Sequence, residues 1–145
     1  MANFSGNVHG GTILKLLDQV AYACASRYSG SYVVTLSVDK VNFKEPIHVG
    51  ELVTFLASVN HVGRTSMEIG IRVEAQNIQK RTVRHTNSCY FTMVAVDENG
   101  KPKQIPSLNL DNDWKRCRFE AAEYRKIARL NENHHPSCSI YKKTV

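Results

Sequence analysis

A single carboxylate, Asp18, interrupts an otherwise apolar segment, and two adjacent glycines, Gly10 and Gly11, precede it by about two helical turns. If this segment is a helix, Asp18 lies about 10 Å beyond Gly11 along the axis, and its side chain leans back toward the glycines. The first amides of a helix have no intrahelical acceptor and lie at the positive end of the helix dipole, so they can hold a developing oxyanion. The spacing leaves room for a carbonyl group and a water. It predicts a polarising helix end opposite a carboxylate base or nucleophile.

A second interpretation of Asp18 involves no chemistry. Lys15, Asp18, Gln19 and Tyr22 share one helical face, because they follow the i, i+3, i+4, i+7 spacing. Asp18 is then one member of a solvated polar stripe, as on many amphipathic helices. Periodicity alone favours neither interpretation.

The elements that must position these residues follow from the hydrophobic pattern. Residues 12–28 are predicted to form a helix that is mostly enclosed by the rest of the protein, because only a narrow polar stripe interrupts it. The step Ser29-Gly30 is expected to end this helix. Alternating and β-branched residues then predict four strands, over residues 32–43, 49–62, 67–75 and 82–96. We therefore expect an α+β fold, in which a long central helix is wrapped by a curved antiparallel sheet.

The character of the sequence changes after Pro106. From residue 111 onward there are eight Lys and Arg against five Asp and Glu, so half of the net charge of +6 lies in this part of the chain. Asp113 is expected to cap a second helix over residues 114–131, whose predicted apolar stripe is Trp114, Cys117, Ala121, Tyr124 and Ala128. We expect a main domain over residues 1–110, followed over residues 111–145 by a basic C-terminal helix and a loose tail.

Size and composition are those of one globular domain, with 145 residues of which 42% are hydrophobic and 22% charged. No apolar run is long enough to span a membrane, and the N-terminus lacks the basic and apolar regions of a secretory signal. The four cysteines form no C-x-x-C pair, which favours free thiols in a reducing, cytoplasmic setting. His134, His135 and Cys138 alone do not make a zinc ligand set, so we expect no metal site.

The net charge of +6 predicts an anionic partner. Nucleic acid, a membrane surface and a phosphorylated small molecule all carry suitable charge. A nucleic-acid-binding function would depend on this charge alone, because the chain has no RNP-like aromatic motif, zinc finger or short arginine-dense helix. We therefore expect neither a nucleic-acid partner nor membrane insertion.

Four stretches of the sequence are similar, in the same order, to one known family; they are Asn3–Asp18 (NFSGNVHGGTILKLLD), Ser37–Val53, Gly63–Ile69 and Tyr90–Pro102. They resemble the acyl-coenzyme A (acyl-CoA) thioesterases of the hot-dog fold. Within that family they resemble the acyl-CoA hydrolase branch, which includes brain-type cytosolic hydrolases and small bacterial acyl-CoA thioesterases. The resemblance covers roughly residues 2–108, about three quarters of the chain.

This resemblance implies a hot-dog fold and subunits that pair into a double hot dog, with active sites shared across the dimer interface. It implies that Asp18 is the catalytic carboxylate and that Asn3 of the partner subunit positions the thioester or the water. A Gly10 or Gly11 amide would polarise the thioester carbonyl. One sequence leaves Asn3 and Asn7 interchangeable as the site asparagine. The resemblance also implies a homo-oligomer, often a trimer of dimers.

The chemistry of a thioester suits a site with one carboxylate. A thioester is activated toward acyl transfer and releases a good leaving group, so no Ser-His-Asp triad is required. Asp18 would act as a general base on water, or attack the carbonyl to give a mixed anhydride. His9 would orient the loop or the substrate, or would hydrogen-bond the loop backbone as a structural residue. Related hot-dog dehydratases pair a histidine with an acid, but the residues around His9 resemble the thioesterase pattern.

The excess of Lys and Arg would serve to bind the substrate if that substrate is acyl-CoA. Coenzyme A carries a pyrophosphate and a ribose phosphate, which suit Arg and Lys. The turn of Gly63, Arg64, Thr65 and Ser66 offers amides, hydroxyls and a guanidinium as an anion nest, and in similar thioesterases this loop lies near the nucleotide end of the cofactor. Arg84 is a further candidate, together with Lys80 and Arg81. No additional cofactor is required, because CoA is part of both substrate and product.

The acyl chain requires an apolar slot beside the first helix. Leu14, Leu17 and Tyr22 are candidates, and core packing is the alternative role for the two leucines. Taken together, the residues and the resemblance predict an acyl-CoA hydrolase. The alternative is a hot-dog protein that binds acyl-CoA without hydrolysing it, as a sensor or carrier, because fold does not fix function. The intact Asp18 counts against that alternative, since a pure binder gains nothing from an acid beside a thioester.

Overall fold

A computed structural model describes residues 2–132 of the chain. The chain divides into two compact units, Met1–Asn109 and Leu110–Val145. The candidate ligands His134, His135 and Cys138 and the predicted loose tail lie outside the described residues. Within residues 2–132 no helix is long and apolar enough to cross a membrane.

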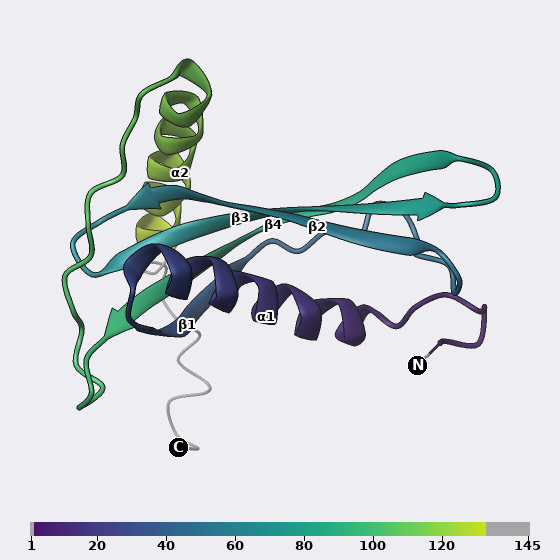
Figure 1. Ribbon diagram of the computed structural model, residues 1–145, viewed down its shortest axis with the longest axis horizontal. Coiled ribbons are helices and arrows are strands. Elements are labelled where there is room, and N and C mark those ends of the chain that lie inside the picture. Colours follow the sequence, from purple (N-terminus) through teal and green to yellow (C-terminus); the bar gives the residue numbers. More distant parts are fainter. Residues whose placement is uncertain (1, 133–145) are drawn as a thin grey trace. The chain divides into compact units, whose positions relative to one another are not determined.

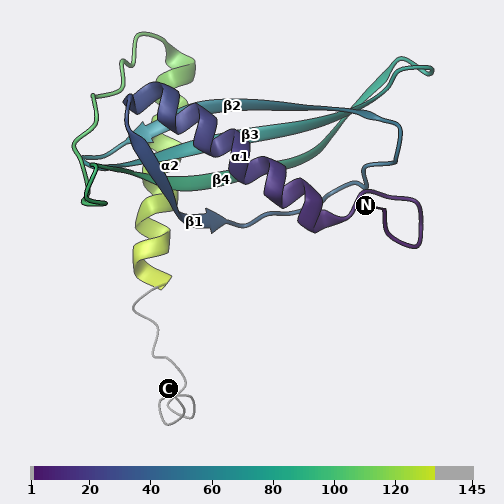
Figure 2. The ribbon, with the colours of Figure 1, turned by 60° about the horizontal axis from the view of Figure 1, so that its bottom comes forward.

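The first unit consists of one long helix, α1 (Gly10–Ser29), and a four-stranded antiparallel sheet. The strands are β1 (Tyr32–Asp39), β2 (Leu52–Val62), β3 (Ser66–Asn77) and β4 (Thr82–Val96), and they lie in the order β1-β4-β3-β2. Two views show α1 running along one face of this sheet (Figure 1, Figure 2). The predicted hot-dog arrangement of a helix packed in an antiparallel sheet is confirmed.

One stripe of α1 forms the centre of the core. Ile13, Leu17, Ala21 and Ala25 recur every four residues and are buried against the inner face of the sheet. The prediction that the helix is mostly enclosed is wrong, because Leu14, Leu16 and Tyr22 are each more than one-third exposed. The physical reason is geometric, since a sheet on one side covers only one stripe of a helix. A second apolar flank of α1 therefore has no cover within the first unit.

Strand β1 is an edge of the sheet and is shorter than predicted. It ends at Asp39 rather than at residue 43, because Lys40 adopts a positive φ of 30° and the chain leaves the sheet. A β-bulge between Thr35 and Ser37 interrupts its pairing with β4. Several of its apolar side chains are exposed, namely Tyr32, Val34, Leu36 and Val38. The edge thus combines unpaired backbone groups with apolar side chains.

Helix α2 (Asp113–Glu132) belongs to the second unit. Its predicted cap is wrong by one position, because the Lys115 amide donates to Asn112 Oδ1 at 2.9 Å and Asp113 already belongs to the first turn. The residues of the predicted apolar stripe are exposed. Trp114 and Tyr124 are about three-quarters exposed, whereas Ala122 is buried. Ala122 lies on a different face of α2 from these residues.

Candidate active site

The N-terminus of α1 presents one free amide. His9 is the N-cap residue, and its Nδ1 accepts a hydrogen bond from the Gly11 amide at 3.2 Å. The same residue's carbonyl accepts from the amides of Thr12 and Ile13. The structure therefore shows His9 in the backbone-bonding role and uses the Gly11 amide for capping. Of the two predicted oxyanion donors, only the Gly10 amide has no acceptor among residues 2–132.

The loop before α1 places Asn3 beside this helix end. Asn3 Oδ1 accepts from the amides of Ser5 and Asn7, at 3.0 and 3.1 Å. Because two donors fix the oxygen, the NH₂ group is the end of the Asn3 carboxamide that remains available. Asn7 has a different role, since its Oδ1 lies 2.7 Å from His48 Nδ1. The two asparagines that the sequence left interchangeable are therefore distinguished by their hydrogen bonds.

A small pocket of about 260 Å³ lies at this end of α1. Its polar lining is Asn3, Asn7, Gly10 and Glu45, and its apolar lining is Val8, Ile13, Phe43, Pro46 and Ile47. The ring of Phe43 lies 3.5 Å from the position that a Cβ on Gly10 would occupy. The glycine therefore brings a bare backbone amide next to an apolar wall.

Asp18 is exposed and lies away from that pocket. Its Oδ1 accepts a hydrogen bond of 2.7 Å from Thr35 Oγ1, on the edge strand β1. Eight residues separate it from Gly10, which corresponds to about 12 Å along the helix axis. Within one protomer the carboxylate and the free helix amide are thus at separate places. Thr35 is a candidate site residue that the sequence did not reveal, because only the fold brings β1 beside the middle of α1.

Arg84 has a full set of partners at the N-terminal end of α1. Its guanidinium donates to Glu45 at 2.7 Å, to both oxygens of Glu51 at 2.8 and 2.9 Å, and to the Pro46 carbonyl at 3.2 Å. Burial raises the pKa of Glu51, but hydrogen bonds from the His48 amide and Arg84 outweigh this, so that its pKa lies below the ordinary value. The predicted role of Arg84 in phosphate binding has no support in this geometry, since two carboxylates already match its charge.

The turn Gly63–Ser66 lies at the other end of the sheet. Ser66 pairs with Val94 on β4, whereas Arg84 pairs with Ala75 nine residues further along β3, a distance of about 30 Å. The Gly63 amide donates to the Ser66 carbonyl at 2.8 Å, so it is not available to an anion. Arg64 is exposed, and Thr65 and Ser66 are half-buried. One protomer does not bring the predicted phosphate-binding groups together.

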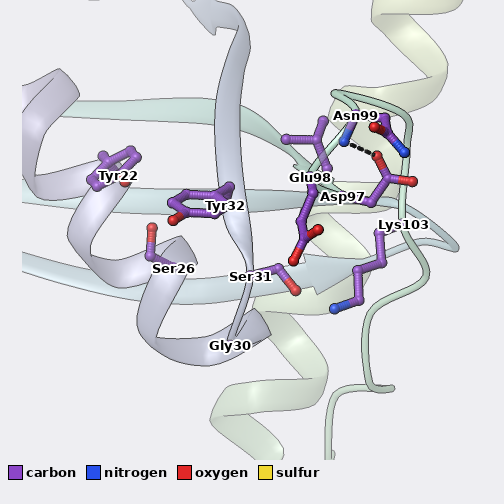
Figure 3. Close-up of a pocket in the computed structure, with 10 residues that line it drawn as sticks. Tyr22, Ser26, Gly30, Ser31, Tyr32, Asp97, Glu98, Asn99 and Lys103 are labelled. Atoms are coloured by element: carbon purple, nitrogen blue, oxygen red, sulfur yellow. Dashed lines mark hydrogen bonds between the residues drawn. The ribbon is translucent and has the colours of Figure 1, made fainter.

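A larger pocket of about 710 Å³ opens beside the second half of α1 (Figure 3). Tyr22 and Ser26 from the helix and Tyr32 from β1 line it, together with the turn that follows β4, including Glu98 and Lys103. Tyr22, which lines the pocket, lies one helical turn beyond Asp18 on α1. The other two candidates for the acyl slot, Leu17 and Leu14, do not line this pocket. Leu17 is fully buried in the core, and Leu14 is 37% exposed.

The described part of the chain contains no cluster of three or more His, Cys, Asp or Glu that could hold a metal. It contains three free thiols, of which Cys24 is half-buried, Cys89 is buried and Cys117 is exposed. Burial raises the pKa of Cys89 to about 11. A reactive cysteine therefore does not lie in the core.

Comparison with known proteins identifies relatives over most of the chain. Residues 5–82 match the family model of the thioesterase superfamily. Protein VdlD of Helicobacter pylori is 55% identical over 128 residues, which cover 88% of this chain and 73% of that protein. The crystal structure of an apo-hexameric acyl-CoA thioesterase is 36% identical, with a TM-score of 0.88 over 92% of this chain and 86% of that chain.

An acyl-CoA hydrolase from Staphylococcus aureus, solved with butyryl coenzyme A and coenzyme A, is 29% identical, with a TM-score of 0.80 over 91% of this chain and 83% of that chain. That protein was also solved with an asparagine, an aspartate or a threonine replaced by alanine. In its sequence the aspartate follows the asparagine by 15 positions, and the threonine follows the aspartate by 17.

Proposed function

Because this chain belongs to the thioesterase superfamily, we propose that it hydrolyses acyl-CoA thioesters to a free acid and coenzyme A. One observation carries the proposal. Asn3, Asp18 and Thr35 are 15 and 17 positions apart, the same residue types at the same spacing as the three residues replaced in the S. aureus acyl-CoA hydrolase. Two of them, Asp18 and Thr35, are joined by a hydrogen bond. The same spacing favours Asn3 over Asn7 as the site asparagine.

Each group has a role in this reaction. The Thr35 hydroxyl donates to Asp18 Oδ1 and leaves Oδ2 free to take a proton from water. Alternatively, the carboxylate attacks the thioester carbon, the CoA thiolate leaves, and water hydrolyses the mixed anhydride. The Gly10 amide is the donor for the carbonyl oxygen, and the Asn3 NH₂ group orients the thioester or the water.

The active site is proposed to form between two protomers. Within one chain Asp18 lies about 12 Å along α1 from Gly10, too far for one thioester group to contact both. The exposed apolar residues of β1 and of the uncovered flank of α1 require a partner surface. Pairing of two β1 edges about a two-fold axis would extend the sheet and bring Asn3 of the partner subunit toward Asp18. The hexameric thioesterase of similar fold supports a trimer of such dimers.

The two ends of the substrate have separate candidate positions. The pocket lined by Tyr22, one helical turn from Asp18, is large enough for part of an acyl or pantetheine chain. The exposed Arg64 and the hydroxyls of Thr65 and Ser66 are suited to the phosphates of the nucleotide. Arg64→Ala is then expected to raise KM for acyl-CoA more than it lowers kcat, and to have no effect on a pantetheine thioester that lacks the nucleotide.

The decisive experiment is a hydrolysis panel over acyl-CoA chain lengths with detection of the released thiol, comparing the natural protein with Asp18→Asn. Loss of a general base or nucleophile is expected to lower kcat about 10²- to 10⁴-fold while affinity for acyl-CoA persists. Gln19→Ala, an exposed neighbour on the same helix, is the matched control. The exposed Cys117 reacts with thiol reagents and must be subtracted as background.

Two outcomes would count against the proposal. Full activity in Asp18→Asn would show that another group is the base. Tight binding of acyl-CoA without turnover by the natural protein would favour a sensor or carrier.

A further inference from the structure

The loop that carries Asn3 is held by hydrogen bonds rather than by hydrophobic burial. Residues 2–6 are all exposed, and the side chain of Phe4 makes no core contact. Such a segment is expected to fray unless it is tied down. We propose that Arg84, Glu51, His48 and Asn7 form a relay that fixes the Asn3 carboxamide in its working orientation; they are positioning residues. This inference rests on the proposed function, which gives Asn3 its role.

The relay starts on β4, in the interior of the sheet order. Arg84 holds both oxygens of Glu51, whose side chain is only 7% exposed, and it reaches Glu45 and the Pro46 carbonyl as well. A guanidinium fixed by four acceptors has one available geometry. The segment of residues 45–51 is thereby anchored to the sheet.

The middle of the relay passes from this segment to the loop. Glu51 Oε2 accepts from the His48 amide at 2.9 Å, which fixes the backbone of His48. The His48 ring then places Nδ1 2.7 Å from Asn7 Oδ1. Because a carboxamide oxygen only accepts, Nδ1 is the protonated ring nitrogen. An isolated bridge between Asn7 and His48 reinforces this contact.

The last step reaches Asn3. The Asn7 amide donates to Asn3 Oδ1 at 3.1 Å, and the Asn7 carbonyl accepts from the Asn3 amide at 2.8 Å. The Ser5 amide supplies a second donor to the same Oδ1. Displacement of Asn7 would therefore remove one of the two donors that hold the Asn3 carboxamide, together with the backbone bond between the two residues. A misplacement of about 1 Å can lower a rate about 10²-fold. The fixed position of the Asn3 carboxamide is therefore expected to affect turnover.

A kinetic cycle tests the relay. His48→Ala removes the link to Asn7 and is expected to lower kcat about tenfold with KM within about twofold, whereas His48→Asn keeps a donor near Nδ1 and is expected to recover most of the rate. In an Asn3→Ala background, adding His48→Ala is expected to change kcat by less than about twofold. Independent, multiplicative losses, or full activity in His48→Ala, would overturn the relay.

Hydrogen exchange of the Ser5 and Asn7 amides gives a readout that does not depend on hydrolysis. Both amides bond to Asn3 Oδ1, so Arg84→Gln and His48→Ala are each expected to increase their exchange about tenfold. Arg72→Gln is the matched control, because it breaks the 2.7 Å ion pair to Glu74 on β3, which is not part of the relay. Unchanged exchange in both relay variants would refute the relay. If exchange increases but the natural protein hydrolyses no acyl-CoA, the proposed function fails and the relay stands.

Discussion

Two regions of the candidate active site, the N-terminus of α1 and the surroundings of Asp18, are held in place in different ways. Around the N-terminus of α1, a capped helix, a hydrogen-bonded loop and the Arg84 ion pairs leave two donors, the Gly10 amide and the Asn3 NH₂ group. Around Asp18, one hydrogen bond to an edge strand holds the carboxylate, and the neighbouring apolar side chains are exposed.

The two regions differ in whether one protomer supplies all of their contacts. The N-terminal end of α1 is held within one protomer, because the Glu51 carboxylate, the Arg84 guanidinium and the His48 amide are hydrogen-bonded to one another there. The carboxylate end has its unpaired strand edge and uncovered apolar flank at the same place. A second copy of the chain supplies both missing contacts in the proposed dimer.

The largest effect is expected from a charge placed on the exposed β1 edge. Leu36→Lys is expected to prevent β1 pairing and to lower kcat/KM more than about 100-fold, because the site would lose its partner donors. Leu36 is 68% exposed, so the protomer itself is expected to stay folded by circular dichroism. Light scattering and hydrolysis assays provide the measurement, with Leu56→Lys on the opposite edge strand as the control. A fully active monomer would show that one chain completes the site.

A smaller effect is expected at the single bond that holds the carboxylate. Thr35→Val keeps the shape of the side chain but removes the donor to Asp18, so we expect kcat to fall about tenfold, the equivalent of one hydrogen bond to a charged group. Thr35→Ser retains a hydroxyl and should be close to normal. Steady-state kinetics with one acyl-CoA decide this. Equal loss in both variants would indicate that packing of Thr35, not its hydroxyl, matters.

The smallest effect is expected at acidic pH, on the contribution of Glu51 to the free energy of unfolding. The pKa of Glu51 is lower in the folded chain than its ordinary value of 4.5, so its contribution to stability is present above that value and is lost as the pH falls through the folded pKa. We expect the free energy of unfolding to decrease by about 1 kcal/mol more in the natural protein than in Glu51→Gln between pH 6 and the acid limit. Urea unfolding at several pH values measures this difference. Parallel curves for the two proteins would contradict it.

Much of this architecture could be predicted from the sequence because its signals are local. The alternation of Met67, Ile69 and Ile71 is confined to one strand, and Gly30 ends α1 through its own left-handed conformation, with φ of 62°. Asp18 could be singled out because an acid within an apolar helix is visible in the residue types alone. The glycine pair was visible for the same reason.

The remaining site could not be predicted because its contacts join distant residues. Thr35 meets Asp18 only after the sheet has formed, and Arg84 meets Glu45 and Glu51 across 39 and 33 residues. Asn3 and Asn7 differ in their hydrogen-bond partners, which join residues that the sequence pattern alone does not bring together. The exposure of one flank of α1 could not be predicted either, because it depends on the sheet covering only one side of the helix.

The exposed β1 edge has a consequence for how the protein behaves at low concentration. If two chains complete each active centre, catalytic output follows the law of mass action, and dilution toward the dimer dissociation constant lowers the specific activity of every chain. Saturating ligand that bridges both chains would oppose that loss. The abundance of the protein in its host then sets not only how many catalysts exist but what fraction of them is assembled.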